Sequence, residues 1–245
     1  MYFKFVFLTV LSHLICICTA AENENKTIAA VYYETYCPDS IKFITTQLYP
    51  TYEKLNGTYF TPHLQPFGRA NITNLPNGTL AFSCQHGEKE CYGNKVHACV
   101  LYLSAPLSSK LKFVNCSLAR TNMKTVDPYA YPIEECATES SLNVQDIKSC
   151  LGNTNLTDSL LSAYGAETKK YPIPSFPFII FNQKFDAALS KESEQDFASV
   201  ICKNYIPAND TKTANVCKPP NSSATTLAFT AFPVIVVTFL FSKLY

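Results

Sequence analysis

The amino-acid sequence predicts an α/β domain interrupted by a large helical insertion. Runs of strand formers alternate with helically spaced apolar residues at the start of the chain, a long helical block occupies its middle, and strand signals return afterwards. The 245 residues fit one domain with appendages, since a domain usually takes about 100–200 residues. Hydrophobic residues make up 47% of the chain, enough to bury a core.

The first part of the domain carries a strand signal followed by a helix signal. Thr27–Tyr33 (TIAAVYY) is a short apolar run rich in strand formers. The stretch after it has apolar residues at helical spacing, namely Ile41, Ile44, Leu48 and Tyr52. Pro50 is expected to kink or end this helix, because proline lacks the backbone N–H that a helix interior needs.

Two further strands are expected before the helical block. Thr58–Phe67 (TYFTPHLQPF) predicts an extended strand that Pro62 and Pro66 interrupt. Thr79–Ser83 predicts another strand, which follows the Asn77-Gly78 turn.

The helical pattern extends from Glu88 to Tyr164. Its first helix has one apolar face, formed by Cys91, Val96, Cys99, Val100 and Leu103. Shorter helices are expected within Leu107–Leu118, Ile133–Leu142 and Val144–Leu151. We place the whole insertion at about residues 84–170.

The last part of the domain returns to a sheet. Phe178–Phe181 (FIIF) is a continuous apolar run that predicts a strand, and Asn182-Gln183 predicts a tight turn into a strand over Lys184–Asp186. A final helix is expected over Ser190–Tyr205. An α/β sheet with one helical insertion is the simplest architecture for this order of elements.

The N-terminal end resembles a targeting signal. Lys4 lies within an otherwise apolar run that continues from Phe5 to Cys18, and small residues follow that run. This pattern predicts a secretory signal peptide over residues 1–21, which leaves residues 22–218 as the working domain.

The C-terminal end carries a second hydrophobic segment. The apolar run from Leu227 to Phe241 is shorter than the about 20 residues that usually span a bilayer. Residues 219–245 therefore predict either a marginal membrane anchor or a lipid-anchor signal, and a tail that is neither is the third alternative. The acceptor of a lipid anchor would be Asn221, Ser222 or Ser223.

The sequons agree with a secreted chain, and the net charge argues against a nucleic-acid partner. Asn-x-Ser/Thr, the acceptor pattern for N-linked glycans, occurs at Asn25, Asn56, Asn71, Asn77, Asn115, Asn155, Asn209 and Asn221. The formal net charge of +1 gives no electrostatic reason to expect a nucleic-acid partner.

The cysteine count predicts one unpaired thiol. Loss of Cys16 and Cys18 with the signal peptide leaves an odd number of cysteines. Cys37 stands alone, directly after the first strand and at the start of the first helix, where backbone N–H groups and the helix dipole favour a thiolate. The nearby Asp39 disfavours it. We expect Cys37 to be a reactive nucleophile, and the alternative is a further structural cysteine.

The residues Cys37-Pro38-Asp39-Ser40 support the reactive interpretation. A strand, a Cys-x-x-Cys motif and a helix in this order are the redox arrangement of thioredoxin-like proteins. Here only the last residue of the motif differs.

The stretch from Cys84 to Cys99 (CQHGEKECYGNKVHAC) carries a longer motif. One interpretation is a zinc site with Cys84, His86, Cys91, His97 and Cys99 as candidate ligands. Secretion argues against zinc, because free thiolates oxidise there. The stretch resembles instead the Cys-Gln-His-Gly-x2-Glu-Cys-x2-Asn-x4-Cys signature of the gamma-interferon-inducible lysosomal thiol reductase family. The matching residues are Cys84, Gln85, His86, Gly87, Glu90, Cys91, Asn94 and Cys99.

This resemblance covers nearly the whole working domain and includes the stretch Leu64 to Gly68 (LQPFG) and the late pair Cys202 and Cys217. It implies a thioredoxin-like fold in which a proline, usually with a cis peptide bond, faces the active cysteine. Pro177 matches that position, and Pro174 is the rival. The resemblance further implies a thiol reductase that acts on disulfide-bonded proteins in an acidic endolysosomal compartment.

Ser40 is where the chain departs from efficient family members, which carry a second cysteine at this position. Without it, a mixed disulfide on Cys37 must be resolved by an outside thiol such as glutathione or cysteine, and no other cofactor is expected. The Ser40 hydroxyl can still donate a hydrogen bond to a Cys37 thiolate. The alternative function is a binding or structural module that has lost turnover.

The other eight cysteines are expected to form four disulfides. Eight cysteines can pair in 105 different ways, and their number alone does not choose among them. They are Cys84, Cys91, Cys99, Cys116, Cys136, Cys150, Cys202 and Cys217. We pair only Cys202 with Cys217, because together they close a short loop. His86 is either a proton carrier near the thiol or a structural residue of a stapled turn.

Overall fold

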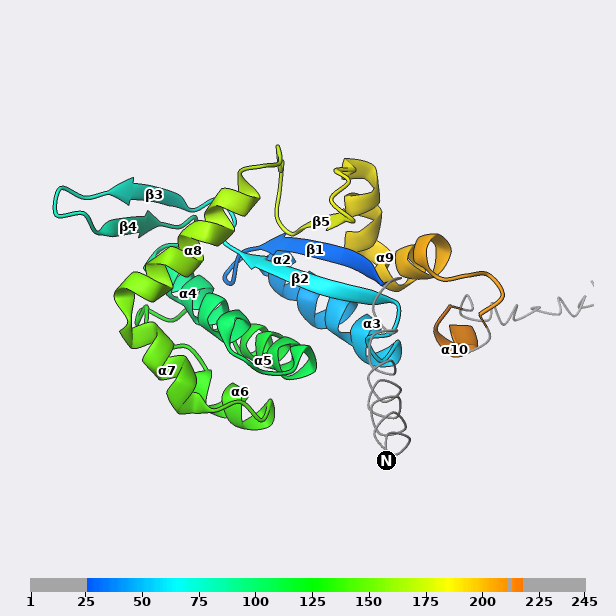
Figure 1. Ribbon diagram of the computed structural model, residues 1–245, viewed down its shortest axis with the longest axis horizontal. Coiled ribbons are helices and arrows are strands. Elements are labelled where there is room, and N and C mark those ends of the chain that lie inside the picture. The colour runs from blue at the N-terminus through cyan, green and yellow to red at the C-terminus, as the bar shows by residue number, and fades with distance from the viewer. Residues whose placement is uncertain (1–25, 211–212, 218–245) are drawn as a thin grey trace, which may run out of the picture.

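The computed structural model describes residues 26–210 and 213–217. In this part of the chain the central sheet has three strands in the order β2-β1-β5 (Figure 1). They are β1 (Thr27–Tyr33), β2 (Phe60–Pro66) and β5 (Phe178–Phe181). The central strand β1 pairs parallel with β2 and antiparallel with β5. This arrangement confirms the predicted α/β, thioredoxin-like fold.

A continuous helical run follows β1, and Pro50 does not end it. The run consists of α2 (Pro38–Phe43), the π-helical turn η1 (Ile44–Leu48) and α3 (Tyr49–Lys54). Leu48 and Tyr49 keep right-handed helical backbone angles across the junction. The prediction that the helix ends at Pro50 is wrong, because the wider π turn changes the hydrogen-bond pattern directly before the residue that lacks an N–H.

The two prolines of β2 do not interrupt that strand either. All seven residues of β2 are in register with β1, from Phe60 opposite Thr27 to Pro66 opposite Tyr33. An edge strand tolerates proline, since one side of its backbone has no partner strand to accept an N–H. The next strands, β3 (Asn71–Asn74) and β4 (Leu80–Ser83), pair as an antiparallel hairpin that projects from the body of the domain (Figure 1). The prediction for Thr79–Ser83 is confirmed by β4, whereas β3 was not predicted.

The predicted helical insertion is confirmed, and it forms one side of the molecule (Figure 1). Its helices are α4 (Glu88–Tyr102), α5 (Leu107–Ala119), α6 (Ile133–Glu139), α7 (Val144–Gly152) and α8 (Thr154–Thr168). Helix α8 was not anticipated as a separate helix, because its sequence is largely polar and only a few positions, among them Leu161 and Gly165, are buried. Its start carries a recognisable cap, since the Asn153 side chain accepts the Leu156 N–H.

The segment after β5 turns tightly and then becomes helical. Asn182 and Gln183 have positive φ values of 48° and 62°, as a tight turn requires. The expected strand over Lys184–Asp186 is reduced to a single bridge between Phe181 and Lys184. Asp186 instead caps the long helix α9 (Ala187–Tyr205) by accepting the Leu189 N–H, so this helix begins earlier than predicted. A short helix, α10 (Ala214–Cys217), follows.

Two hydrophobic cores meet at the end of β1. One face of β1, with Val31 and Tyr33, packs against the helical run and α9. The insertion has its own core, and Tyr36 belongs to it, with its ring 6.3 Å from that of Tyr131. Since Tyr36 directly precedes Cys37, the predicted nucleophile lies where the sheet and the insertion join.

Candidate active site

Cys37 is the residue that starts the helical run. It is the N-cap of α2, its backbone N–H donates to Glu34 O at 3.3 Å, and its carbonyl accepts the Ile41 N–H at 3.0 Å. Its thiol is unpaired, and the residue is 9% exposed. Only a small part of the residue is therefore open to solvent.

A proline loop faces this thiol. Cys37 Sγ donates to the carbonyl oxygen of Phe176 at 3.6 Å, and the Phe176–Pro177 peptide bond is cis. Pro177 itself is buried. Pro174, the rival, has a different place, because its carbonyl accepts the Arg69 guanidinium. The sequence positions of Cys37 and Pro177 thus meet in space.

Ser40 lies beneath the site and is fully buried. Its Oγ accepts the Glu34 backbone N–H at 3.4 Å. Within the described part of the chain, no hydrogen bond joins Ser40 Oγ to Cys37 Sγ. The expected serine-to-cysteine bond is therefore replaced by two separate ones, because the Ser40 hydroxyl faces the end of β1 and the Cys37 thiol faces the proline loop.

The eight remaining cysteines of the domain form four disulfides. The pairs are Cys84–Cys91, Cys99–Cys150, Cys116–Cys136 and Cys202–Cys217. The zinc interpretation is wrong for this structure, because Cys84, Cys91 and Cys99 are all oxidised and a disulfide sulfur is not a thiolate ligand.

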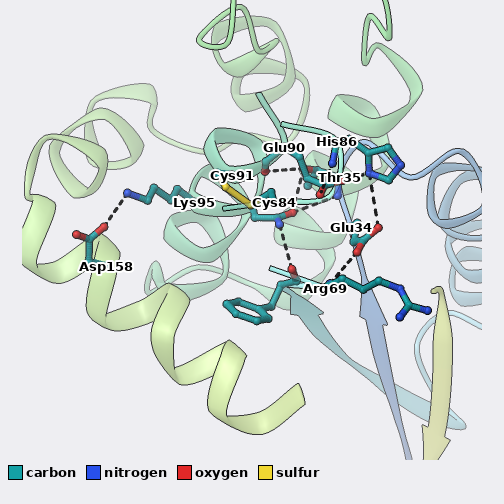
Figure 2. Close-up of a disulfide and its surroundings, with 11 residues drawn as sticks. Glu34, Thr35, Arg69, Cys84, His86, Glu90, Cys91, Lys95 and Asp158 are labelled. Atoms are coloured by element: carbon teal, nitrogen blue, oxygen red, sulfur yellow. Dashed lines mark hydrogen bonds and ion pairs between the residues drawn. A yellow bond between two sulfur atoms is a disulfide. The ribbon is translucent and has the colours of Figure 1, made fainter. Parts of the chain in front are cut away.

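The Cys84–Cys91 disulfide closes a loop that brings His86 and Glu90 to Glu34. His86 Nδ1 lies 2.5 Å from Glu90 Oε2 and 3.7 Å from Glu34 Oε2. Figure 2 shows the Glu34 carboxylate between the His86 ring and the backbone of Arg69. Burial, followed by the Glu90 carboxylate, raises the pKa of Glu34, whereas the Arg69 N–H and the charges of His86 and Arg69 oppose this shift.

Among the described residues, these three are the only acidic, His or Cys side chains spaced as ligands of one metal ion, with ligand atoms within 4.8 Å of one another. Both carboxylates already accept hydrogen bonds within the protein. Glu90 Oε1 accepts the His86 backbone N–H, Glu90 Oε2 lies 2.5 Å from His86 Nδ1, and Glu34 Oε1 accepts the Arg69 backbone N–H. We therefore interpret the cluster as a hydrogen-bonded brace behind the Cys37 turn. His86 faces the carboxylates in it.

Arg69, which was not among the predicted site residues, connects this brace to the proline loop. Its backbone N–H donates to Glu34 Oε1 at 2.7 Å, and its guanidinium donates to Pro174 O. The guanidinium also lies 5.7 Å from the centre of the Phe176 ring. The signal was its position directly after the stretch Leu64 to Gly68.

Other residues of the signature hold the scaffold. The Asn94 Oδ1 accepts the Thr35 backbone N–H at 3.1 Å and the Thr35 hydroxyl at 3.0 Å, and its amide donates to Phe67 O. Asn94 thereby fixes the turn before Cys37. These signature residues therefore mainly build the frame around the thiol.

His97 is a buried structural residue. Its two ring nitrogens lie 2.8 Å from Tyr33 Oη on one side and from Ser117 Oγ and Tyr131 Oη on the other. Burial lowers the pKa of His97 to about 3. The imidazole is thus neutral in the folded protein at any pH above that value.

Five of the described sequon asparagines are exposed, namely Asn56, Asn71, Asn77, Asn155 and Asn209, while Asn115 on α5 is half-buried. The sequons at Asn25 and Asn221 lie outside the described residues, as do the predicted signal peptide and the C-terminal hydrophobic segment. Within residues 26–210 and 213–217, no helix combines the length and apolar character needed to cross a membrane.

Comparisons with known proteins show which family this chain resembles in sequence. A family model described as gamma interferon inducible lysosomal thiol reductase (GILT) matches residues 28–140. The chain is 38% identical over 197 residues to a gamma-interferon-inducible lysosomal thiol reductase-like protein of Anopheles gambiae, covering 76% of this chain and 79% of that protein. It is 32% identical to GILT-like protein 1 of Drosophila melanogaster, covering 86% of each chain.

A solved structure of reduced DsbA from Mycobacterium tuberculosis aligns with 81% of this chain and 96% of its own, at 12% identity and a TM-score of 0.47. The sequence relatives carry the assignment. With this identity and coverage, the chain belongs to the gamma-interferon-inducible lysosomal thiol reductase family.

Proposed function

We propose that this protein is a thiol-disulfide oxidoreductase that attacks protein disulfides through Cys37 and is recycled by an external thiol. The observation that carries the proposal is the position of an unpaired thiol at the start of a helical run, 3.6 Å from the carbonyl that precedes cis-Pro177. The thiolate is the attacking form in thiol-disulfide exchange.

The reaction has two stages. The Cys37 thiolate attacks a substrate disulfide, forms a mixed disulfide and releases the first substrate thiolate. An outside thiolate then attacks the mixed disulfide, because Ser40 offers no second sulfur. Overall, two outside thiols become one disulfide while the substrate disulfide becomes two thiols.

The compartment follows from the family and from the sequence ends. We place the reaction in the secretory or endolysosomal pathway, after removal of residues 1–21 and with glycans on the exposed sequons. A tail anchored through residues 219–245 would hold the domain at a membrane surface. Mass spectrometry of the mature protein, before and after glycan removal, tests both ends and the occupancy of each sequon.

Insulin reduction at about pH 5, an endosomal value, tests the enzymatic proposal. With excess cysteine or glutathione the wild-type protein is expected to turn over, and without an outside thiol it is expected to stop at the mixed disulfide. Cys37→Ser should lose all activity. Lys54→Met, at the far end of the same helical run, is the matched control and should keep it. Activity that survives in Cys37→Ser would show that another residue is the nucleophile.

Ser40 favours one other function, a module that captures partners covalently without turnover. In that case Cys37 forms stable adducts with disulfide-bonded proteins, and no outside thiol regenerates it at a useful rate. The same insulin assay separates the two functions, since only the enzyme consumes more than one equivalent of disulfide.

A further inference from the structure

We infer that the Arg69 guanidinium is a binding site for the carboxylate of the small thiol that releases substrate from Cys37. This inference rests on the proposed function, because it concerns its second stage. It assigns the preferred co-reductant to the class of carboxylate-bearing aminothiols, of which cysteine and glutathione are examples.

Phe176 joins the thiol and the cation. Its carbonyl oxygen accepts the Cys37 thiol at 3.6 Å, and its ring lies 5.7 Å from the Arg69 Cζ. The thiol and the cation thus contact the same residue, the thiol at its carbonyl and the cation at its ring. In our proposal, a small thiol whose carboxylate binds Arg69 lies along Phe176 with its sulfur directed toward Cys37.

Arg69 is held at both ends before any ligand arrives. Its backbone N–H donates to the buried Glu34 carboxylate at 2.7 Å, and one guanidinium nitrogen donates to Pro174 O. Gly68, directly before it, has φ +63° and lies against the Glu34 side chain. A side chain fixed in this way loses little conformational freedom on binding, which favours affinity.

The guanidinium retains donors for a ligand. It has five N–H donors, and among residues 26–210 and 213–217 its only hydrogen-bond acceptor is Pro174 O. It forms no ion pair within those residues, and Arg69 is exposed. A carboxylate can accept two parallel N–H bonds from such a group, the strongest geometry for this pair.

The other charges near the thiol do not supply this site. Asp39, two residues after Cys37, is exposed and repels a carboxylate, and its charge acts on Lys191 of α9. His86 is paired with both Glu90 and Glu34 inside the brace. Arg69, by contrast, contacts the proline loop directly, at Pro174 O and at the Phe176 ring.

The chemistry balances with the thiol alone. The thiolate of the bound aminothiol attacks Cys37 Sγ in the mixed disulfide, so that the substrate leaves as a thiolate and Cys37 becomes disulfide-bonded to the aminothiol. A second aminothiol attacks the sulfur of the first, which yields the symmetric disulfide and returns Cys37 as a thiolate.

The test uses the mixed disulfide of the full protein with a neutral peptide, which Ser40 leaves unresolved. The release rate is measured with cysteine and with cysteamine, which share the aminothiol but differ in the carboxylate. The rate with cysteine divided by the rate with cysteamine is expected to fall about three- to tenfold in Arg69→Met. The reason is that the charge-assisted bidentate pair with the cysteine carboxylate is lost. Arg69→Lys should be intermediate, and Lys54→Met should keep the wild-type ratio.

The outcomes separate the inference from the proposed function. An unchanged ratio in Arg69→Met, with release still occurring, overturns the inference and leaves the enzyme intact. Arg69 would instead belong to the substrate site if Arg69→Met kept the wild-type ratio but its Cys37 attacked an acidic peptide disulfide more slowly than a neutral one. That result also overturns the inference. Failure of Cys37 to form any mixed disulfide overturns both proposals. Melting curves of each variant show whether it is folded.

Discussion

The buried hydroxyl of Ser40 accepts a hydrogen bond from the backbone N–H of Glu34 at 3.4 Å. Residue 40 therefore helps to close the turn that presents Cys37. A change at this position tests whether the frame is competent for internal resolution.

Ser40→Cys is expected to restore self-resolution. A thiol at the second position of the motif can attack the mixed disulfide on Cys37 without an outside partner, so the mixed disulfide should be shorter-lived by about tenfold or more. Ser40→Ala is the control, because it removes the hydroxyl without adding a sulfur. It should keep the dependence on outside thiol and cost about 1–2 kcal/mol of stability through the unpaired N–H. Quenched-flow trapping of the adduct measures its lifetime, and an unchanged lifetime in Ser40→Cys would contradict the prediction.

Gly68→Ala is expected to disturb the brace. Gly68 has φ +63°, and an added Cβ would lie 1.9 Å from Glu34 Cγ. Gly78 is a matched control, since it has φ +82° but nothing within 4 Å of the Cβ position. Gly78→Ala should cost about 1–2 kcal/mol for the left-handed backbone alone, and Gly68→Ala should cost about 1–3 kcal/mol more for the steric overlap. Equal losses in urea unfolding would show that Glu34 moves away freely.

The stability of the protein should fall in acid because of His97. Burial lowers its pKa to about 3 in the folded protein, whereas an unfolded histidine has a pKa of about 6.5. Below pH 6.5 the unfolded chain thus binds one more proton, so the free energy of unfolding decreases as the pH falls. Between pH 6.5 and 4.5 the loss is about 2 kcal/mol.

His97→Gln should reduce that slope by about one proton, whatever it does to the absolute stability. His63→Gln, at an exposed position of β2, is expected to leave the slope unchanged. Denaturant unfolding at several pH values gives both numbers. A slope that His97→Gln does not alter would mean that the imidazole is protonated in the folded state.

The disulfides should differ in their contribution according to loop length. Cys99–Cys150 spans 51 residues and Cys84–Cys91 spans 7. In the chain-entropy account, replacing the first pair by alanines costs about 4 kcal/mol and replacing the second about 2.5 kcal/mol. The second replacement should nonetheless affect the site more, because it frees the loop that carries His86 and Glu90. Comparing melting temperatures with rates of Cys37 alkylation separates the two effects.

Local signals in the sequence were sufficient for much of the fold. Thr27–Tyr33 and Phe178–Phe181 are apolar enough on their own to predict the central strand β1 and its antiparallel partner β5. The signature from Cys84 to Cys99 predicted the family. The wrong predictions at the prolines concern positions where the surrounding structure overrides the local preference of the residue. Pro50 and the prolines of β2 are accommodated by a π turn and by an edge position, neither of which is visible in a short stretch of residues.

The sequence by itself determined which sulfur is set apart from the others and that a serine stands three residues after it, since both follow from residue identity and count. Only the tertiary structure decided what surrounds that sulfur. Glu34 and Arg69 are 35 residues apart, and Cys37 and Phe176 are 139 apart. Contacts over such distances depend on how β1, the insertion and the proline loop pack together, and that packing is a property of the whole chain rather than of any short segment.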